Sequence, residues 1–510
     1  MEVTLISTDS SITANGLRVF ASMLKKSKVR CNCIFMIPPE RNGASKSLYP
    51  EKSIEQACRI AANSDIVGVS SVSISSRHAI EVLNAVKEST RALTVWGGIH
   101  ATTMPEECIK FADVVCIGEG EGAFLDLVNA MLKRRPITRI KNLWVNKNGK
   151  VFRNPARNLL ENLDSLPFPS FDLDKSHVLE GDALVCFEER HLGGKYLVSG
   201  SRGCPHSCTY CCNALLQKLY LNKGKSVRFR SIENLILELE QAVKKFPSIN
   251  EIIFTDDVFI IRPKEELEKF SMLYREKIRL PFQYYVSPLT ISEEKLKILV
   301  GAGQTKLAMG IQSGSERVNF EVYKRFTSRE KILHSAEIIH KYSGNMCYPP
   351  VYDLIIFNPY ERAEDVIESI RTVSEIRPPF VISAYILAFF PGTELYCNAL
   401  SEGKISNDSI FALDYLGFNG IISIQRPDRY LNSLVYLMSG RASERIIGAI
   451  PRFMLGFLTN RKVVAFNEKF PFIYLAVLFI VIQKRTLPKK ILGLMPSGIK
   501  KAIKLAFGRK

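Results

Sequence analysis

Three cysteines on one short stretch carry the clearest chemical signal in the sequence. Cys204, Cys208 and Cys211 follow the spacing C-x3-C-x2-C, with glycines ahead of them and an aromatic residue, Tyr210, just before the third. Three thiolates on so short a loop suit a [4Fe-4S] cluster better than zinc, because structural zinc usually takes four ligands from two separated pairs. A cluster with three protein ligands leaves one iron open to a substrate or cofactor. The alternatives are a zinc knuckle and a chance grouping of cysteines.

The composition is that of a large globular protein. The chain has 510 residues, of which 46% are hydrophobic and 10% aromatic, and we expect so long a chain to divide into several domains. The other cysteines, including Cys212, are scattered, many of them in apolar runs, and are expected to pack as small hydrophobic residues in a reducing compartment. The chain opens on strand-like residues instead of a charged segment followed by an apolar one, so we expect a cytoplasmic protein.

The net charge of +18 is unevenly distributed. Nine Lys and Arg residues and no acidic residue lie between positions 484 and 510, whereas the rest of the chain is only mildly basic, which argues against a nucleic-acid partner. Residues 498–507 have the pattern of a basic amphipathic helix, which predicts either contact with the inner face of an anionic membrane or a solvated lysine face. Residues 472–482 are almost wholly apolar, but a membrane span needs about 20 such residues, so a buried or interfacial helix is expected.

Strand-like and helix-like segments alternate over residues 1–140. Short apolar runs at 3–7, 31–37, 65–71, 93–96 and 114–117 are mostly separated by helical stretches, which predicts a doubly wound parallel sheet. Ligands bind such sheets beyond the carboxyl ends of the strands. The residues that follow the strands are small, polar or acidic: Thr8, Ser71, Gly97, Gly98, Thr102, Glu119 and Gly120. This edge is therefore a predicted ligand site.

The same alternation returns over residues 191–400. Strand-like runs at 196–199, 252–254, 282–286, 306–311, 353–357 and 382–389 indicate six βα units. Between 141 and 190, Asn148-Gly149 predicts a hairpin, and the proline-rich stretch 163–169 predicts an extended linker. Beyond position 401 the residues 430–438, 442–455 and 463–470 are predicted to be mainly helical. Four regions are thus expected: 1–140, 141–190, 191–400 and 401–510.

The cysteine loop resembles the signature of the radical S-adenosylmethionine superfamily, C-x3-C-x-aromatic-C. Residues 96–102 and 117–121 look like parts of the cobalamin-binding domain that precedes the barrel in one subclass, which includes the class B methyltransferases. The resemblance implies a doubly wound N-terminal domain, a partial six-stranded TIM-type barrel and a helical C-terminal region. It also implies three cofactors: a [4Fe-4S] cluster, S-adenosylmethionine, and cobalamin at the N-terminal edge described above.

Further family segments stand at successive predicted strand ends. Thr255-Asp256-Asp257 stands where the family meets the amino group of S-adenosylmethionine, and Gln312-Ser313 where it contacts the ribose. Pro391 belongs to a P-G-T segment similar to the one near adenine, and Tyr210 of the cysteine loop is implied to lie at the same cofactor.

Two positions depart from the family pattern. The D-x-H-x-x-G motif, whose histidine ligates cobalt in many cobalamin proteins, is absent from the sequence, and His100 is expected to pack or to support the site indirectly. A domain that has lost cobalamin is therefore an alternative. In the fifth strand-end segment Phe357 and Tyr360 replace glycines of the family, which leaves the approach of the backbone there open.

The resemblance implies a radical S-adenosylmethionine enzyme. The leading hypothesis is methylation of an unactivated carbon of a small-molecule or lipid substrate through a 5'-deoxyadenosyl radical and methylcobalamin, with an electron donor such as flavodoxin or ferredoxin. Three alternatives stay open. The first keeps both cofactors and forms or contracts rings without methyl transfer; the second joins or rearranges lipid carbons without cobalamin; the third is a cobalamin-binding regulatory protein with a vestigial cluster.

Overall fold

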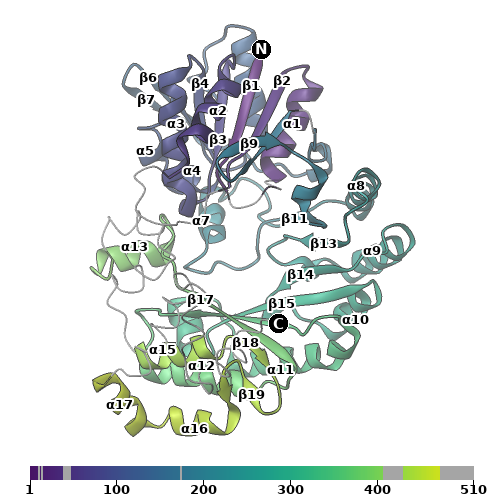
Figure 1. Ribbon diagram of the computed structural model, residues 1–510, viewed down its shortest axis with the longest axis vertical. Helices are drawn as coiled ribbons and strands as arrows, with labels where there is room; N and C mark the ends of the chain where they lie inside the picture. Colours follow the sequence, from purple (N-terminus) through teal and green to yellow (C-terminus); the bar gives the residue numbers. More distant parts are fainter. Residues whose placement is uncertain (10–11, 13–14, 38–47, 173–174, 406–428, 471–510) are drawn as a thin grey trace. The chain divides into compact units, whose positions relative to one another are not determined.

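The computed structural model describes residues 1–9, 12, 15–37, 48–172, 175–405 and 429–470, which fold into two compact units (Figure 1). The first unit comprises Met1–Ile253 together with Phe390–Cys397. The second comprises Phe254–Phe389 and the described residues from Asn398 onward. Each unit contains its own buried core.

The first unit is built on the predicted doubly wound sheet, which has nine strands in the order β7-β6-β5-β4-β3-β1-β2-β8-β9. Its central strands β1 to β5 are parallel neighbours, as expected of buried apolar runs joined by helices. The bounds are β1 Glu2–Ser7, β2 Arg30–Phe35, β3 Ile66–Ser70, β4 Leu93–Gly97, β5 Val114–Cys116, α1 Asn15–Lys26, α2 Glu51–Ala61, α3 Ser76–Ser89, α4 Ile99–Thr103, α5 Pro105–Cys108 and α6 Glu121–Leu132.

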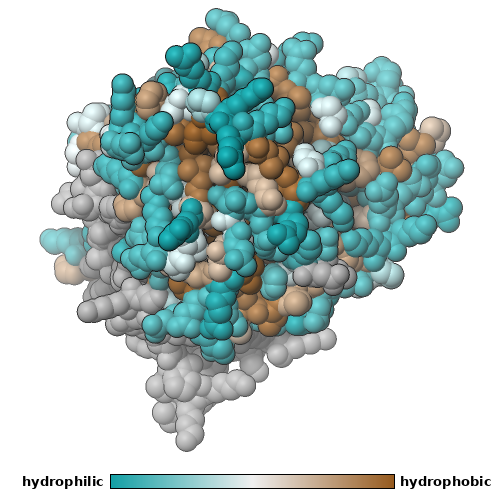
Figure 2. All heavy atoms as spheres, turned by 90° about the horizontal axis from the view of Figure 1, so that it is seen from above, coloured by the Kyte–Doolittle hydropathy of each residue, from teal (hydrophilic) through white to brown (hydrophobic). Residues whose placement is uncertain are grey.

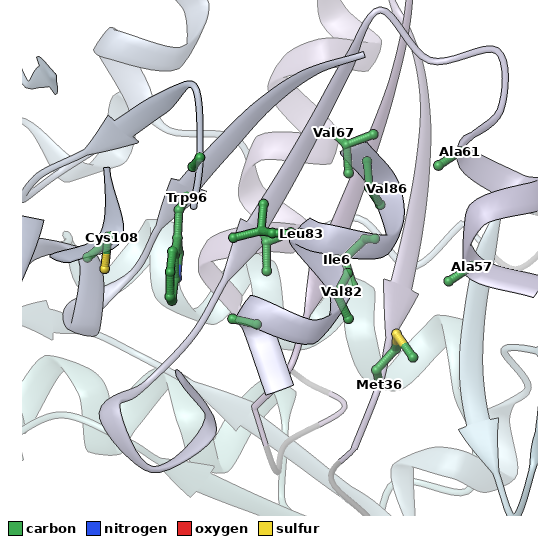
Figure 3. Close-up of a cluster of buried hydrophobic side chains, with 14 of the residues drawn as sticks. Ile6, Met36, Ala57, Ala61, Val67, Val82, Leu83, Val86, Trp96 and Cys108 are labelled. Carbon is green, nitrogen blue, oxygen red and sulfur yellow. The ribbon is translucent and has the colours of Figure 1, made fainter. Parts of the chain in front are cut away.

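Helices cover both faces of this sheet. Figure 3 shows one face, where Val82, Leu83 and Val86 of α3 lie over Val67 and Trp96 of the strands. On the other face Phe20 of α1 packs against Phe124 of α6, with ring centroids 5.3 Å apart. Burying an aliphatic or aromatic side chain of this size stabilises a fold by about 1.5–3 kcal/mol, so this core holds the strand ends in fixed positions.

The predicted hairpin joins β6 (Leu143–Lys147) to β7 (Lys150–Arg153) and extends the first sheet. Asn148 and Gly149 have φ values of 52° and 82°, the left-handed pair that a tight hairpin turn requires. The following segment, expected to be a linker, also contains two strands, β8 (Ser176–Glu180) and β9 (Ala183–Cys186). A tight turn at Gly181-Asp182 joins these two strands. The prediction of a linker missed this hairpin, although Gly-Asp between two apolar runs is a hairpin signal.

Six strands alternate with helices over the predicted barrel region, and β14 to β17 are parallel neighbours. This confirms the predicted fold class. The bounds are β10 Lys195–Val198, β11 Ser201–Arg202, α7 Cys212–Leu219, β12 Arg228–Phe229, α8 Ile232–Lys245, β13 Glu251–Phe254, α9 Lys264–Lys277, β14 Phe282–Val286, α10 Glu293–Gly301, β15 Gln304–Gln312, α11 Arg329–Tyr342, β16 Val351–Ile356, α12 Ala363–Glu375, β17 Phe380–Ile386 and α13 Glu394–Ser401. Of these strands, β10, β13, β14, β15, β16 and β17 correspond to the six predicted barrel strands.

The two faces of the barrel strands differ in burial. On β15, Leu307 and Met309 point to the face that the helices cover and are fully buried. Lys306 and Ala308, which alternate with them, stay partly exposed on the opposite, inner face. A closed TIM barrel fills its interior with packed side chains, so this open inner face leaves room for a ligand.

Between residues 429 and 470, the described part of the C-terminal region combines helices with short strands. The predicted helices at 430–438 and 463–470 are confirmed as α15 (Arg429–Leu437) and α17 (Arg461–Lys469). The prediction of helix over 442–455 was wrong, because this segment forms the short strands β18 (Gly440–Ala442), β19 (Ile446–Ile447) and β20 (Ile450–Pro451) before α16 (Leu455–Leu458). Gly448 turns the chain there with a φ of 57°, which a helix interior does not accommodate. The apolar run 472–482 and the basic tail 498–507 lie outside the described residues.

Within the described residues we find no helix whose length and apolar character would let it cross a membrane. Figure 2 shows one face of the molecule, on which hydrophilic side chains surround smaller areas of hydrophobic ones.

Candidate functional site

The cysteine loop runs from β11 to the start of α7 and is held by several contacts. Cys208 is 4% exposed, whereas Cys204 and Cys211 are partly exposed. The amide of Cys211, the residue before α7, donates to the carbonyl of Cys208 at 3.0 Å. From within α7, Nε2 of Gln217 donates to the carbonyl of Cys204 at 2.8 Å. The backbone of the loop is therefore fixed independently of any bound group.

A glycine is required at the entrance to this loop. Gly203 has a φ of 88°, and a Cβ atom at this position would overlap the carbonyl oxygen of Ser226. The close approach of the two backbones explains why the residue directly before the first cysteine is glycine. It also fixes the direction in which Cys204 leaves β11.

The segment with Pro391 packs beside the cysteine loop, in the same unit. The amide of Leu395 donates to the carbonyl of Thr209 at 2.9 Å. Gly392 has a φ of 81°, and a Cβ there would lie 3.0 Å from both the carbonyl of Thr103 and the side chain of Leu215. The structure thus brings two of the predicted S-adenosylmethionine segments together, the one at Pro391 and the cysteine loop with Tyr210.

At the predicted cobalamin edge, hydroxyl groups join neighbouring loops to one another. Nε1 of Trp96 donates to Oγ of Ser71 at 2.9 Å. Oγ1 of Thr102 donates to the carbonyl of Gly98 and accepts from the amide of Gly118, both at 2.9 Å. These bonds tie the loops after β3, β4 and β5 into one edge, as the sequence predicted for residues at the strand ends.

The first strand end joins the same edge. Thr8 is fully buried, and its hydroxyl lies 3.3 Å from the hydroxyl of Ser75. Gly97 is partly exposed and Gly98 is exposed, and Gly98 has a φ of 92°. A Cβ at Gly98 would lie 2.7 Å from the carbonyl of Ser71, so a larger residue would push the two loops apart.

Glu119 connects this edge to the segments around the cysteine loop. Its carboxylate accepts from Arg228 at 2.6 Å and pairs with Arg202 at 3.4 Å, while Glu121 accepts from Arg202 at 2.5 Å. Burial would raise the pKa of Glu119, but the hydrogen bond from Arg228 and the charge of Arg202 outweigh it and hold that pKa below its ordinary value. The carboxylate therefore stays ionised. Arg202 lies two residues before Cys204, so one arginine links both predicted cofactor loops.

A tyrosine completes this connection. The hydroxyl of Tyr220, which follows α7, accepts from the amide of Glu119 at 2.6 Å. A Cβ at Gly118 would overlap the Tyr220 hydroxyl, so the glycine lets the ring reach the backbone. Sequence reasoning missed Arg202, Tyr220 and Arg228. Glu119 and Arg228 are 109 residues apart, and only the folded chain pairs them.

In the second unit, Gln312 and Ser313 end β15 with a strained turn. Gln312 has a φ of 69° and is partly exposed, and its side-chain amide lies against Gly310, where a Cβ would be 2.5 Å from Nε2. A non-glycine residue with positive φ is uncommon and is concentrated at functional sites. Ser313 is 1% exposed and lies 3.2 Å from the hydroxyl of Ser369.

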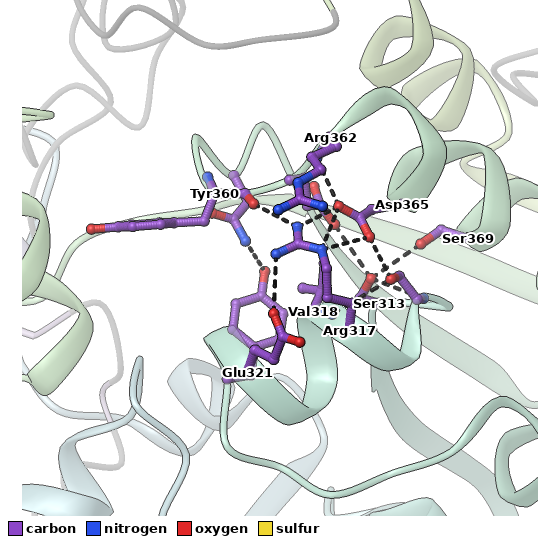
Figure 4. A network of polar contacts seen from close by, with 12 residues as sticks. Ser313, Arg317, Val318, Glu321, Tyr360, Arg362, Asp365 and Ser369 are labelled. Atoms are coloured by element: carbon purple, nitrogen blue, oxygen red, sulfur yellow. Dashed lines mark hydrogen bonds and ion pairs between the residues drawn. The ribbon is translucent and has the colours of Figure 1, made fainter.

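An ion-paired network supports this turn (Figure 4). Arg317 binds Asp365 through Nε at 3.2 Å from both carboxylate oxygens, and Oγ of Ser315 donates to Asp365 at 2.7 Å. Burial would raise the pKa of Asp365, but the hydrogen bonds from Arg317 and Ser315 outweigh it and lower that pKa. These contacts hold the backbone that follows the predicted ribose segment. Asp256 is buried and Asp257 exposed, both just after β13.

Phe357, which departs from the family pattern, has a backbone conformation that glycine adopts most readily. It has a φ of 59° and is 5% exposed, and its amide donates to Oδ1 of Asn432 in α15 at 2.6 Å. The departure from the family pattern is thus accommodated by a contact from the C-terminal region, which sequence reasoning did not assign.

Comparison with known proteins agrees with this geometry. Residues 1–128 match the B12 binding domain, and residues 198–373 match the radical SAM superfamily. The chain thus contains a B12 binding domain followed by a radical SAM domain. It is accordingly an enzyme, and its cofactors are a [4Fe-4S] cluster, S-adenosylmethionine and cobalamin.

Relatives of this radical SAM chain include several methyltransferases. The chain is 28% identical over 376 residues to an uncharacterized methyltransferase of Pyrococcus horikoshii, covering 73% of this chain and 76% of the relative. It is 23% identical to the bacteriochlorophyllide d C-8(2)-methyltransferase of Chlorobaculum tepidum, over 72% and 74% of the two chains. The radical SAM methyltransferase TsrM of Kitasatospora setae has a similar fold, with a TM-score of 0.61, 16% identity, and coverage of 79% and 75%.

The cysteine loop of this radical SAM enzyme fits its cluster. Three thiols lie on one loop whose backbone is fixed, and α7 begins next to Cys211, where the positive end of the helix dipole favours a thiolate. Among the described residues no three His, Cys, Asp or Glu side chains are grouped to hold a single metal ion. A [4Fe-4S] cube does not need such a group, because each thiolate binds a different iron.

The cobalamin edge fits a bulky planar ligand held without a histidine. His100 is 3% exposed, packs against Trp96 with ring centroids 5.6 Å apart, and burial lowers its pKa to about 4. It is therefore a neutral packing residue. Gly97 is partly exposed and Gly98 is exposed, and neither carries a side chain that would obstruct a flat ligand at this edge.

Proposed function

We propose that this enzyme methylates an unactivated carbon of a small-molecule substrate, with Cys204, Cys208 and Cys211 as the ligands of its cluster. The carrying observation is that the cysteine loop and the cobalamin edge are joined within one compact unit through Arg202, Glu119 and Glu121. A regulatory protein with a vestigial cluster would not need this connection. Several relatives are named methyltransferases, which supports the same reaction here.

When bound, the three cofactors supply an electron, a carbon radical and a methyl group. The protein chain itself binds and positions these cofactors. We propose that the exposed backbone at Gly97 and Gly98, with the loops that Thr8, Ser71 and Thr102 hold, receives cobalamin, and that Glu119 and Gly120 hold the far side of this edge. Tyr210, Asp256, Asp257, Gln312, Ser313 and Pro391 are the proposed S-adenosylmethionine residues. A carboxylate at Asp256 or Asp257 would orient the ammonium group of that cofactor through a charge-assisted hydrogen bond.

Cysteine variants of the anaerobically reconstituted full chain test the ligand assignment. We expect Cys208→Ser to lose the iron–sulfur absorption and the formation of 5'-deoxyadenosine under dithionite. Cys212→Ser is the matched control, because Cys212 is the adjacent cysteine and lies in α7. Equal loss in both variants, or retention in both, would contradict the assignment.

We further propose that the enzyme works at an anionic membrane surface and takes electrons from a small donor protein such as flavodoxin or ferredoxin. Four phenylalanines near the C-terminal end of the described chain are exposed, from 86% for Phe453 to 43% for Phe470. One of them, Phe466, lies on α17 together with the exposed cations Arg461, Lys462 and Lys469. Aromatic side chains beside cations are the composition of a helix that lies at a lipid interface.

Vesicle sedimentation tests this location. We expect the full chain to sediment with vesicles that contain phosphatidylglycerol and to stay in solution with phosphatidylcholine vesicles. Phe453→Ser combined with Phe457→Ser should weaken sedimentation. Self-association of the chain without vesicles, abolished by the same variants, would show instead that the four phenylalanines form an interface between copies.

A further inference from the structure

The inner face of the second unit's barrel sheet contains a cavity of about 300 Å³ whose charged residues have no assigned role. Its lining includes Tyr285 of β14, Lys306 of β15, Asp353 of β16, Tyr385 of β17 and Arg441 of β18. A volume of this size accommodates a small ligand or one polar portion of a larger substrate. The inner face of the sheet thus carries both charged and aromatic side chains at this cavity.

Asp353 is the most unusual group in this cavity. It is partly buried, yet its carboxylate has no hydrogen bond or ion pair with any residue in the described part of the chain. Burial raises the pKa of Asp353 to about 6, although Lys306 acts in the opposite direction. An unpaired, partly buried carboxylate destabilises a fold, so such groups are usually paired or functional.

Two phenol rings accompany this carboxylate. Burial, followed by the negative charge of Asp353, raises the pKa of both Tyr285 and Tyr385, so both rings keep their protons. Both side chains are about half exposed, at 48% and 58%, and therefore present their surfaces to the cavity. A carboxylate beside aromatic rings attracts a cation through charge and through the ring faces.

The cationic residues lie toward the other end of the cavity. In the strand register Asp353 is opposite Gly310 and Ser383. Lys306 comes four residues before Gly310, and Arg441 pairs with Val381, two residues before Ser383. With about 3.3 Å per strand residue, these positions place both cations nearer the amino ends of the strands. Neither Lys306 nor Arg441 pairs with an acidic side chain within the described residues.

We propose that this cavity binds a zwitterionic portion of the methyl acceptor, with a protonated amine at Asp353 and an acidic group at Lys306 and Arg441. The proposal rests on the proposed function. The amine end faces the carboxyl ends of the strands, where Gln312 ends β15, and the acidic end faces away from them. Asp353 is then a specificity-determining residue. The lining carries two cations and one carboxylate, so a phosphate with an amine complements its charge better than an amine alone.

Ligand-observed NMR on the anaerobically reconstituted full chain tests this directly. The probes are O-phosphoethanolamine and β-alanine as zwitterions, and ethanolamine and inorganic phosphate as the separate halves. At pH 7.5 we expect O-phosphoethanolamine to bind at least tenfold more tightly than either half. Comparison of the two zwitterions identifies the acidic group. Tighter binding of O-phosphoethanolamine indicates a phosphate, and tighter binding of β-alanine indicates a carboxylate.

Two variants separate the ends of the cavity. Asp353→Asn should abolish the advantage of O-phosphoethanolamine over phosphate, and Lys306→Met should reduce its advantage over ethanolamine, because Arg441 then binds the acidic group alone. Asp182→Asn, an exposed carboxylate of the first unit, is the matched control and should change nothing. Thermal unfolding measures whether each variant folds. Asp353→Asn reports on the amine end of the cavity, and Lys306→Met reports on the acidic end.

The pH dependence of ethanolamine binding provides a second readout. Ethanolamine should bind more weakly at pH 5 than at pH 7.5, because Asp353 takes up a proton in between. The other titratable groups that line the cavity around Asp353 are Lys306, Arg441, Tyr285, Tyr348 and Tyr385. Side chains of these three types ordinarily titrate well above pH 7.5. In Asp353→Asn this pH dependence should disappear.

Equal binding of the zwitterions and their halves, or unchanged binding in Asp353→Asn, would overturn the proposal. These measurements need no reductant and no methyl transfer, so they are independent of the reaction. A chain that transfers methyl groups without preferring a zwitterion overturns the cavity proposal alone. A chain that prefers the zwitterion but transfers no methyl group overturns the proposed function and retains the cavity as a binding site.

Discussion

The cobalamin edge of the first unit and the cavity of the second use polar side chains in opposite ways. At the edge, the hydroxyls of Ser71 and Thr102 and the carboxylate of Glu119 all bind other parts of the protein and thereby fix its loops. In the cavity, Asp353 and Lys306 face open space without partners among the described residues. If both proposals hold, the groups that shape the proposed cofactor site are satisfied by the fold, whereas the groups proposed to select the substrate are left for the ligand to satisfy.

The largest effect expected on the first region comes from the cysteine loop. Cys208→Ser should reduce 5'-deoxyadenosine formation to the background of the assay, because removing one thiolate leaves the cluster with two protein ligands. Cys212→Ser should keep the activity of the unchanged chain. Activity that depends equally on both residues would remove the distinction between ligand and packing cysteine.

A variant of Arg202 tests whether the ion pairs with Glu119 and Glu121 stabilise the edge. Arg202→Met leaves Glu121 without its partner and should lower the free energy of unfolding of the first unit by about 2 kcal/mol. The chain's two tryptophans, Trp96 and Trp144, both belong to this unit, so their fluorescence in a urea titration reports it. Adding Glu121→Gln should restore part of the loss. No restoration would mean that Arg202 acts through packing instead of charge.

Gly98 tests the geometry of the same edge against a matched glycine. Gly98→Ala should weaken cobalamin binding, measured by absorbance titration, by roughly tenfold, since strain and a displaced Ser71 loop together amount to about 1–2 kcal/mol. Gly149→Ala is the control, because Gly149 also has a positive φ, of 82°, but has open space around it. Equal losses of cobalamin affinity would show that backbone strain alone is responsible.

Asp353 and Asp365 give the smallest effects, of opposite sign. The folded-state pKa of Asp353 is raised, to about 6, so its favourable contribution to stability is present at low pH and is lost as the pH rises through 6. Asp353→Asn should therefore raise the stability of the second unit at pH 7.5 by about 1 kcal/mol, after discounting for solvent screening, and should have little effect at pH 4.

The pKa of Asp365 is lowered instead, so its contribution is present at neutral pH and is lost on acidification below its ordinary range. Asp365→Asn should destabilise the second unit at pH 7.5. Hydrogen exchange in β16 and α12 measures both variants. If both variants destabilise the unit at pH 7.5, Asp353 is a structural residue and the comparison between the two regions fails.

The sequence was sufficient to predict the parts that depend on local pattern. Cysteine spacing located the cluster loop, apolar runs located the strands, and Asn148-Gly149 located a hairpin that the structure confirms. Small residues at strand ends were sufficient to predict that their loops meet at one edge, because parallel strands bring their carboxyl ends to one side of the sheet. The assignment of individual residues to cobalamin and S-adenosylmethionine stays a prediction.

Long-range pairing could not be predicted in this way. Tyr285, Asp353 and Tyr385 lie on three strands, and each alone is an ordinary polar residue in a strand. The pairing of Glu119 with Arg228 depends on the docking of two segments. Residues 442–455 were wrongly predicted to be helical, because short apolar runs fit a helix as well as a strand and the turn at Gly448 decides between them.

The most direct test of the account follows the methyl group. The anaerobically reconstituted full chain, with cobalamin, a reductant, methyl-labelled S-adenosylmethionine and a small-molecule extract of the source organism, should release 5'-deoxyadenosine and a labelled product. Label in the product should require cobalamin and should vanish in Cys208→Ser. Release of 5'-deoxyadenosine with no label in any product would contradict methyl transfer as the function of this enzyme.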